Sequence, residues 1–432
     1  MTESLIGFAV LIVLLLLRVP LAFAMGIVGF FGFYFLVGSN WAVAESMAAR
    51  RVVDTAQSYT LSVIPLFILM GNLVARAGLS DAVFRASHAF LGHRKGGQSM
   101  ATIVASGGFS AICGSSLATA ATMAKVAMPQ MRKYGYKDSL GSASIAAGAT
   151  LGILIPPSVM LVVYGIITET SIRALFAAGL IPGILGVVLY ILAVKWVVYR
   201  DPDAGPRGDY TPWRERVRAL GSVGDTIALF VLVIGGIYIG VFTPTEAAGV
   251  GAAGAFVIAL MRRALTFRVL YDVLVDTVRM TAMLFAVVLS ALIFANFINR
   301  AGLPSELLAF VSGLDVEPWM VVLAIIGIYI LLGCVFESMS MLMLTVPVFY
   351  PVVAGMGLDL VWFGILVVIV IEISLITPPV GMNIFVLRAV LPDVPTSTMF
   401  RGVTPFWVAG ITRVLIVLAV PGVAMFLPNL LY

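Results

Sequence analysis

The sequence predicts an all-α, polytopic membrane protein, on three observations. Of its 432 residues, 61% are hydrophobic and 11% are charged, whereas soluble domains have roughly 45–50% and 25%. Apolar stretches of about 20 residues, the length of a membrane-spanning helix, recur along the chain. Two long stretches also resemble each other at a nearly constant spacing, which indicates a tandem repeat. At roughly 20 residues a span, there is room for about ten to twelve spans and for no sizeable soluble domain.

The first 60 residues are expected to form scaffold helices. The apolar helix that starts at Leu5 is interpreted as a retained span rather than a signal peptide, because Glu3 precedes it and no small-residue cleavage site follows Leu17. The stretch Trp41–Ser58 carries four charged residues and is too polar to span. We expect it to be a helix that lies at the membrane interface.

The internal repeat rests on several matches. "NLVARAGLS" from Asn72 matches "NFINRAGLP" from Asn296 at an offset of 224, and "LGILIPPSVM" from Leu151 matches "ISLITPPVGM" from Ile373 at an offset of 222. The chain therefore contains a duplication, with repeat 1 at 61–182 and repeat 2 at 284–405. Residues 183–283 are expected to be connecting scaffold helices, and 406–432 a C-terminal helix.

The matching segments 98–130 and 319–352 differ in the charges that flank them. Basic residues flank the first (Arg94, Lys95, Arg132, Lys133, Lys137) and acidic residues the second (Asp315, Glu317, Asp359). Because lysine and arginine are enriched in cytoplasmic loops, both ends of the first segment are expected in the cytoplasm and both ends of the second outside. Each segment should then enter and leave the membrane on one face.

The centre of each segment is a polar, helix-breaking tip, at Cys113–Ser116 and at Gly333–Ser338. The tips leave arms of about 15 residues, or roughly 22 Å of helix, too short for a hydrocarbon core of roughly 30 Å. We therefore expect two re-entrant helical hairpins that meet from opposite sides. The alternative is an ordinary crossing with a glycine kink.

A span broken at a proline pair follows each predicted hairpin, at 139–168 and 360–387. Irregular backbone inside a membrane is tolerated only where it is buried in protein or lines a cavity. The unpaired carbonyls that end the first half suit a hard cation such as sodium, and the N–H groups that begin the second half suit an anionic group. Each tip and break would form a half-site: Ser115, Ser116 and Thr119 with Gly152–Ser158, and Glu337, Ser338 and Ser340 with Ser374–Asn383.

Several of these residues also have a structural interpretation. The small residues around the first tip occur in plain helix packing as well. Glu337 is either a direct ligand of a cation or substrate or a structural carboxylate, and Glu372, one turn before the second break, is expected to support the site rather than form it. Arg76 and Arg300, at matching positions of the repeats, are expected to cap loops or to lie at the interface rather than to contact substrate. Cys113 and Cys334 are interpreted as small buried side chains.

Other function classes are disfavoured. The sequence has no HExxH, GxSxG or Walker motif, no histidine or lysine beside the serines of the first tip, and no metal spacing at His88 or His93; we expect no enzyme. The net charge of +5 comes from residues scattered through short loops, which excludes a nucleic-acid-binding patch. A channel or a passive scaffold accounts for fewer of these features, because duplicated hairpins of inverted orientation are typical of alternating-access transporters.

Several motifs in order resemble one transporter family. "NLVARAGL", "GSSLATAATMA", "GILIPPSVMLVVYG", "ESMSMLMLTVPVFYPV" and "ITPPVGMNIFVL" together are similar to the large membrane subunit of tripartite ATP-independent periplasmic (TRAP) transporters. The resemblance implies a sodium-driven elevator transporter of carboxylates such as C4-dicarboxylates or sialic acid in the bacterial inner membrane. It implies two partners, a small four-helix membrane subunit and a periplasmic binding protein. The topology would place both termini in the periplasm. The alternative is a stand-alone ion-coupled anion symporter.

The resemblance also assigns residues by motif position. Sodium-binding elements would fall on Ser115, Ser116, Gly152, Ile155, Pro157, Gly333, Ser338, Ser374, Thr377 and Val380. Substrate contacts are expected at Thr119, Ser158, Glu337, Ser340 and Asn383. Asn383 has no counterpart in repeat 1, where Leu161 stands.

Overall fold

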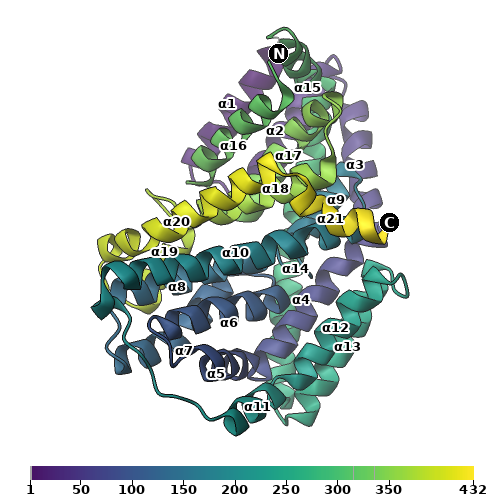
Figure 1. The fold of residues 1–432 in the computed structure, drawn as a ribbon. Helices are drawn as coiled ribbons and strands as arrows, with labels where there is room; N and C mark the ends of the chain where they lie inside the picture. The colour runs from purple at the N-terminus through teal and green to yellow at the C-terminus, as the bar shows by residue number, and fades with distance from the viewer. Residues whose placement is uncertain (1, 315, 335) are drawn as a thin grey trace.

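The computed structural model describes residues 2–314, 316–334 and 336–432, so the predicted acidic flank at Asp315 lies outside the described residues. Across those ranges the chain folds into α-helices and short 3₁₀ turns, with one isolated β-bridge, between Lys95 and Arg207. The all-α prediction is confirmed. In Figure 1 the N-terminus lies at one end of the molecule with α1, and the C-terminal helix α21 lies beside its middle.

The two repeats contain matching series of helices. Repeat 1 comprises α4 (Val63–Arg76), α5 (Leu79–Leu91), α6 (Gly97–Cys113), α7 (Ser116–Lys133), α8 (Asp138–Thr150), η2 (Leu151–Ile153), α9 (Val159–Thr168) and the start of α10 (Ile172–Arg200). Repeat 2 comprises the end of α14 (Phe267–Arg300), α15 (Leu303–Ser312), α16 (Pro318–Gly333), α17 (Ser338–Gly355), α18 (Leu360–Ser374), α19 (Met382–Val390) and the start of α20 (Thr396–Ala419). Gly78 and Gly302, which precede α5 and α15, have matching φ angles of +76° and +75° that favour glycine.

The other helices precede, connect and follow the repeats. They are α1 (Thr2–Leu16), α2 (Leu21–Leu36), α3 (Trp41–Gln57), η1 (Thr60–Ser62), η3 (Pro202–Ala204), α11 (Trp213–Gly221), α12 (Gly224–Tyr238), α13 (Pro244–Met261) and α21 (Gly422–Leu431). The polar helix α3 is bent by 59° from the segment Thr60–Arg76. The Asn40 side chain caps it by accepting from the Val43 amide. A separate polar helix at this place agrees with the sequence.

Fewer helices than expected are long enough to span a membrane. Within the described ranges, five are long and apolar enough (α10, α13, α14, α17 and α20), or up to seven if two bent pairs count as spans. The expected ten to twelve spans assumed about 20 residues in each. Here α8 and α18 end at the breaks after 13 and 15 residues, and α1 and α2 have 15 and 16 residues.

Both predicted hairpins are present as pairs of packed arms. Gln98 at the start of α6 donates its amide to the Tyr136 hydroxyl just beyond α7 (3.1 Å), which closes the base of hairpin 1. Across hairpin 2, Thr345 on α17 donates to the Tyr329 hydroxyl on α16 (2.6 Å). The arms have 16 to 18 residues, or about 24–27 Å at the helical rise. They are slightly longer than expected, and two packed arms exclude a single kinked helix.

The repeats interlock through reciprocal contacts. The half-helix α9 of repeat 1 packs on arm α17 of repeat 2, and α19 of repeat 2 packs on arm α7 of repeat 1. The long helices α10 and α20 lie side by side across the centre of the molecule (Figure 1). Both tips and both breaks are therefore held in one helical body.

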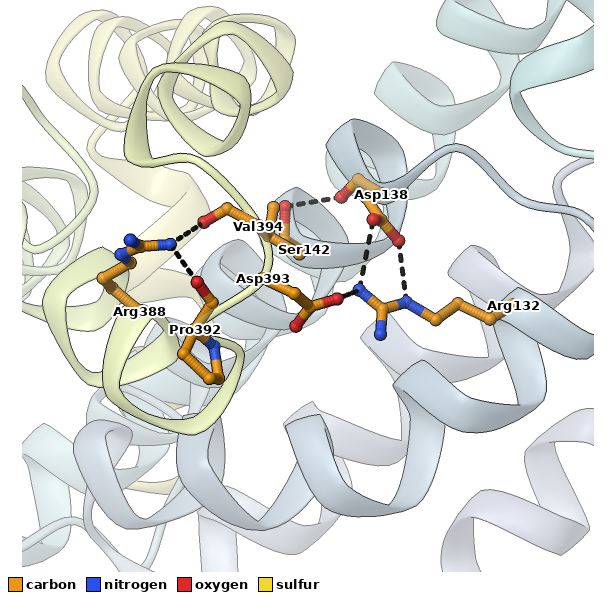
Figure 2. A network of polar contacts seen from close by, with 7 residues as sticks. All are labelled: Arg132, Asp138, Ser142, Arg388, Pro392, Asp393 and Val394. Atoms are coloured by element: carbon orange, nitrogen blue, oxygen red, sulfur yellow. Dashed lines mark hydrogen bonds and ion pairs between the residues drawn. The ribbon is translucent and has the colours of Figure 1, made fainter.

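An ion-pair network joins the repeats at one end of this body (Figure 2). Arg132, at the end of α7, donates to both carboxylate oxygens of Asp138 (2.9 and 3.1 Å) and to Asp393 in the α19–α20 loop. Arg388 donates to two carbonyls of that loop at 2.6 and 2.7 Å. We call Arg132, Asp138 and Asp393 the cross-repeat clasp. It places the α7–α8 turn and the α19–α20 loop at the same end, as the predicted topology requires.

Candidate functional site

The first tip is a tight turn that starts a new helix. Gly114 ends α6 at a φ of +65°, and the Ser115 hydroxyl caps α7 by accepting from the Ala118 amide (3.3 Å). Ser116 is buried, and the fully buried Thr119 has a hydroxyl with no hydrogen-bond partner among the described residues. An uncommitted buried hydroxyl one turn beyond a helix start is available to a ligand.

The first break lies directly against this hairpin. A Cβ on Gly152 would stand 2.0 Å from the Ser110 hydroxyl, so only glycine allows α6 to approach so closely. The Ser158 hydroxyl donates to the Ile153 carbonyl and accepts from the Leu161 amide (3.2 Å), which caps α9. Ser158 and Pro157 are buried. Break 1 therefore packs on the last turn of α6, next to the first tip.

The second tip uses a carboxylate where the first uses a hydroxyl. Glu337 caps α17: its Oε2 accepts from the amides of Met339 (3.1 Å) and Ser340 (3.2 Å) and from the Ser340 hydroxyl (3.4 Å). Its other oxygen, Oε1, accepts no hydrogen bond from a described residue. Ser338, the first residue of α17, is buried. The geometry therefore gives Glu337 a structural role and leaves one oxygen free.

The second break also packs closely against its own hairpin. Here the glycine lies in the hairpin arm and the serine lies at the break. A Cβ on Gly333 of α16 would stand 2.2 Å from the Cβ of Ser374. The Thr377 hydroxyl donates to the Ile373 carbonyl (2.7 Å) and accepts from the Trp407 indole (3.0 Å). Val380 is half-buried, and Gly381 starts α19 at a φ of +59°.

Asn383 lies inside the protein rather than on an open site. Its amide nitrogen donates to the Ala146 carbonyl of α8 (3.0 Å), so it joins the second break to repeat 1. The side chain is fully buried, and its Oδ1 has no partner among the described residues. The sequence predicts a substrate contact at Asn383. In this conformation the contact that Asn383 makes is between the repeats.

The donor chemistry of both breaks fits a sodium ion. The carbonyls of Ile155 and Pro157, and those of Thr377 and Val380, accept no hydrogen bond from a described residue. Hydroxyl oxygens lie in the same segments, and a hydroxyl such as that of Thr377 keeps a lone pair after its two bonds. Neutral oxygens of this kind suit a hard monovalent cation. The described residues hold no group of three His, Cys, Asp or Glu side chains that could bind a metal.

Sequence reasoning missed the partner of Glu372. Arg413 of α20 donates to the Glu372 carboxylate, and both side chains are fully buried. The signal was present, since each is an isolated charge within an apolar helix and such charges usually pair. Arg76 pairs with Asp276 at 3.6 Å on the surface, and His88 contacts Gln98.

The chain is similar to known transporter permeases over most of its length. Residues 8–423 match the family model described as tripartite ATP-independent periplasmic transporter, DctM component. The C4-dicarboxylate TRAP transporter large permease DctM of Pseudomonas aeruginosa is 34% identical, covering 88% of this chain and 89% of that protein. The Ruegeria pomeroyi ectoine/5-hydroxyectoine large permease is 34% identical over 98% of each chain. The Vibrio cholerae sialic acid large permease is 33% identical over 92% of each.

Solved structures share the fold at low identity. The Alcanivorax borkumensis YdaH transporter has a TM-score of 0.66 at 13% identity, covering 89% of each chain, and Neisseria gonorrhoeae MtrF has a TM-score of 0.59 at 13% identity, covering 85% of this chain and 83% of that one. The relatives are transporter permeases and not enzymes, as the sequence predicts. This multi-pass membrane protein belongs to the DctM-component family of tripartite ATP-independent periplasmic transporters.

Proposed function

We propose that this chain is the large permease subunit in sodium-coupled uptake of an organic acid across the bacterial inner membrane. A periplasmic binding protein would deliver the substrate, and a small four-helix membrane subunit would assemble with the permease. Relatives that are named for C4-dicarboxylate, sialic acid and ectoine support a substrate that carries a carboxylate. The observation that carries the proposal is the pair of matched tip–break units, each with uncommitted backbone oxygens.

Each unit would hold a sodium ion. In repeat 1 the ligands would come from the tip at Ser115 and Ser116 and from the backbone of Gly152, Ile155 and Pro157. In repeat 2 they would come from the tip at Gly333 and Ser338 and from Ser374, Thr377 and Val380. Uncommitted carbonyls at Ile155, Pro157, Thr377 and Val380 support this assignment. Bound sodium would supply the positive charge that draws an anionic substrate group between the two units.

The substrate would bind near the N-termini of the four helices that follow a tip or a break. Helices α7, α9, α17 and α19 begin at the tips and breaks, and their N-terminal amides carry partial positive charge. Thr119, with its uncommitted hydroxyl, and Ser340 are the side chains that we expect to contact the substrate. Ser158 and Glu337 would act mainly as helix caps and Asn383 as a contact between the repeats.

The transport cycle would follow an elevator mechanism. The hairpins and broken helices would move as one body past the scaffold helices, carrying the tips and breaks across the membrane. Reciprocal packing of α9 on α17 and α19 on α7 supports rigid-body motion. The charge asymmetry of the hairpin flanks supports a topology with both termini in the periplasm.

Uptake by the reconstituted protein tests this proposal. Proteoliposomes that contain the chain and its small subunit are given labelled C4-dicarboxylate, sialic acid or ectoine, with and without a candidate binding protein. An inward sodium gradient is compared with potassium in its place. We expect uptake only when sodium and the binding protein are both present. Uptake at full rate without the binding protein would favour a stand-alone symporter. Uptake at the same rate with potassium in place of sodium would contradict sodium coupling.

A further inference from the structure

An open apolar groove lies beside hairpin 1, with a volume of about 560 Å³ and walls from α5, α6, α10 and α12. Phe90 of α5 and Leu220 of α11 line it near the base of the hairpin, and Ile112 of α6 and Ile155 of the first break line it near the tip. None of the described residues that line it is charged. We call it the lateral groove.

The short helix α11 at the base of this groove is amphipathic. Trp213, Val217 and Leu220 follow the spacing i, i+4 and i+7, so they share one face, and all three are exposed. We call them the apolar stripe of α11. Arg214 and Arg218 are exposed on the adjoining face. An exposed apolar stripe beside basic residues is typical of a helix that lies in a membrane interface.

The neighbours of α11 place it at the membrane surface. It ends at Gly221, just before the apolar helix α12 begins at Gly224, and the two helices are bent by 55°. Arg262, which follows α13, donates to the Ser222 carbonyl (2.7 Å) and pairs with Asp225 at 2.6 Å. Because charged groups avoid the hydrocarbon core, these residues mark its edge. In Figure 1 α11 lies at the bottom of the view, below α5.

Arg216 of α11 brings a positive charge to the mouth of the lateral groove. Its guanidinium carbon lies 6.0 Å from the centre of the Phe90 ring and 5.0 Å from that of the Tyr210 ring. Nε donates to the Thr211 carbonyl (2.9 Å), whereas Nη2 has no hydrogen-bond partner among the described residues. Glu215, the acidic residue of α11, lies on the face opposite the apolar stripe. A phosphate oxygen at the mouth would give Nη2 a charge-assisted hydrogen bond.

The size of the lateral groove favours a lipid chain over a helix of a partner protein. A transmembrane helix about 10 Å wide and 30 Å long has a volume of roughly 2,400 Å³, several times that of the groove. Such a helix would cover the groove rather than fill it. An acyl chain is thin and apolar, and its phosphate stays at the membrane surface, where Arg216 lies.

We propose that an anionic phospholipid of the cytoplasmic leaflet binds here, with an acyl chain in the lateral groove and its phosphate at Arg216. The basic residues of α11 indicate the cytoplasmic side and complement the charge of the headgroup. The chain would contact Ile112 and Ile155 on one side and Phe230 of α12 on the other, and so hold hairpin 1 and the first break against α12. This lipid partner goes beyond the proposed function and does not depend on sodium coupling.

The test measures the melting temperature of the purified, delipidated protein in detergent at increasing phosphatidylglycerol, because a ligand that binds only the folded state stabilises it. Phosphatidylcholine with the same acyl chains tests the charge of the headgroup. Inorganic phosphate tests whether the headgroup chemistry suffices without a chain. We expect a saturable rise with phosphatidylglycerol and little change with the other two.

Two variants locate the lipid. Gly108→Leu places a side chain in the lateral groove, where a Cβ has room at 3.6 Å from Val83, and leucine favours a helix more than glycine does. Arg216→Gln removes the charge at the mouth. The matched controls are Gly327→Leu, at an exposed glycine of arm α16 with open space around it, and Arg268→Gln, at an exposed arginine of α14.

We expect Gly108→Leu to lose the rise in melting temperature with phosphatidylglycerol. Arg216→Gln should raise the phosphatidylglycerol midpoint by about tenfold, the effect of losing one charge-assisted hydrogen bond. Both controls should keep the wild-type curve.

Three outcomes would overturn the inference. They are equal stabilisation of the wild type by phosphatidylcholine, the same stabilisation by inorganic phosphate, and a wild-type phosphatidylglycerol curve in a folded Gly108→Leu or Arg216→Gln variant. If one variant does not fold, the other carries the test. If neither folds, the wild-type comparison of the two lipids and phosphate decides it.

Discussion

The two breaks share a backbone plan and differ in their chemistry. Each follows a hairpin, contains a proline pair and packs a glycine against a serine of its own repeat. Break 1 is almost entirely buried, whereas Pro378 and Pro379 of break 2 are exposed. Repeat 1 uses Ser115 and Thr150 where repeat 2 uses carboxylates.

This comparison distinguishes the features that both repeats share from those that only one repeat has. Helix starts, close glycine contacts and open carbonyls occur in both halves, so they belong to the arrangement that we propose for ion binding. The carboxylates Glu337 and Glu372 occur only in repeat 2. One of them caps a helix and the other pairs with Arg413 of α20, so the charged side chains beside a tip or a break lie in repeat 2.

The largest effect is expected from removing one charge of the buried pair. Arg413→Met leaves Glu372 buried and unpaired, which should cost about 3–5 kcal/mol. Tyr190 of α10 is the matched residue, because it lies eight residues after Pro182 as Arg413 lies eight after Pro405. Tyr190→Phe removes a hydroxyl that has no hydrogen-bond partner among the described residues and should cost less than about 1 kcal/mol. Melting of the two purified variants in detergent checks the difference. Equal losses of stability in the two variants would show that α10 and α20 do not differ at this position.

The next effect concerns the two close glycine contacts. Gly152→Ala and Gly333→Ala should each cost about 1–3 kcal/mol or more through overpacking. Gly333→Ala clashes first with the side chain of Ser374, so adding Ser374→Gly should restore stability. Gly152→Ala also meets the carbonyl carbon of Ser110 at 2.4 Å, so adding Ser110→Gly should restore it only in part. Melting temperatures of the two single and the two double variants test this prediction. Equal recovery of stability in both double variants would contradict it.

A moderate effect is expected at the second tip. Glu337→Ala removes the cap of α17 and should cost about 1 kcal/mol. Glu337→Gln keeps an oxygen that can accept from the Met339 and Ser340 amides and should preserve stability. If Glu337 is only a cap, the glutamine variant also keeps the wild-type sodium activation of uptake. A raised sodium midpoint in that variant would instead make Glu337 a cation ligand.

The smallest effect is expected at the cross-repeat clasp. The ion pair between Arg132 and Asp393 is solvent-exposed, and exposed pairs contribute little. Asp393→Asn should therefore lower the melting temperature only slightly. Arg132 lowers the pKa of the Asp393 carboxyl, so its stabilisation is complete above the ordinary aspartate pKa of about 3.9 and is lost as pH falls through the lower folded value. The difference between wild type and variant should stay constant from about pH 6 to 8, and a difference that changes there would implicate another group.

Much of this arrangement could be predicted from the sequence because repeats and prolines are local signals. The matched "PP" motifs located both breaks, and the polar tips located both hairpins. Arg413 was missed because its pairing with Glu372 depends on α18 packing against α20, which no short motif encodes. The close contact of Gly152 with Ser110 and the capping role of Glu337 depend on backbone positions that side-chain identity does not report.

The most direct test of the two-site account is a sodium titration of Ser115→Ala and Thr377→Ala, one variant in each half-site. Thr412→Ala is the control, because it removes an exposed hydroxyl on α20 that bonds only to the Val408 carbonyl. The melting temperature and the rate of uptake are measured at increasing sodium. The account predicts that each half-site variant shifts the sodium midpoint upward while the control does not. Wild-type sodium curves in both half-site variants would contradict it.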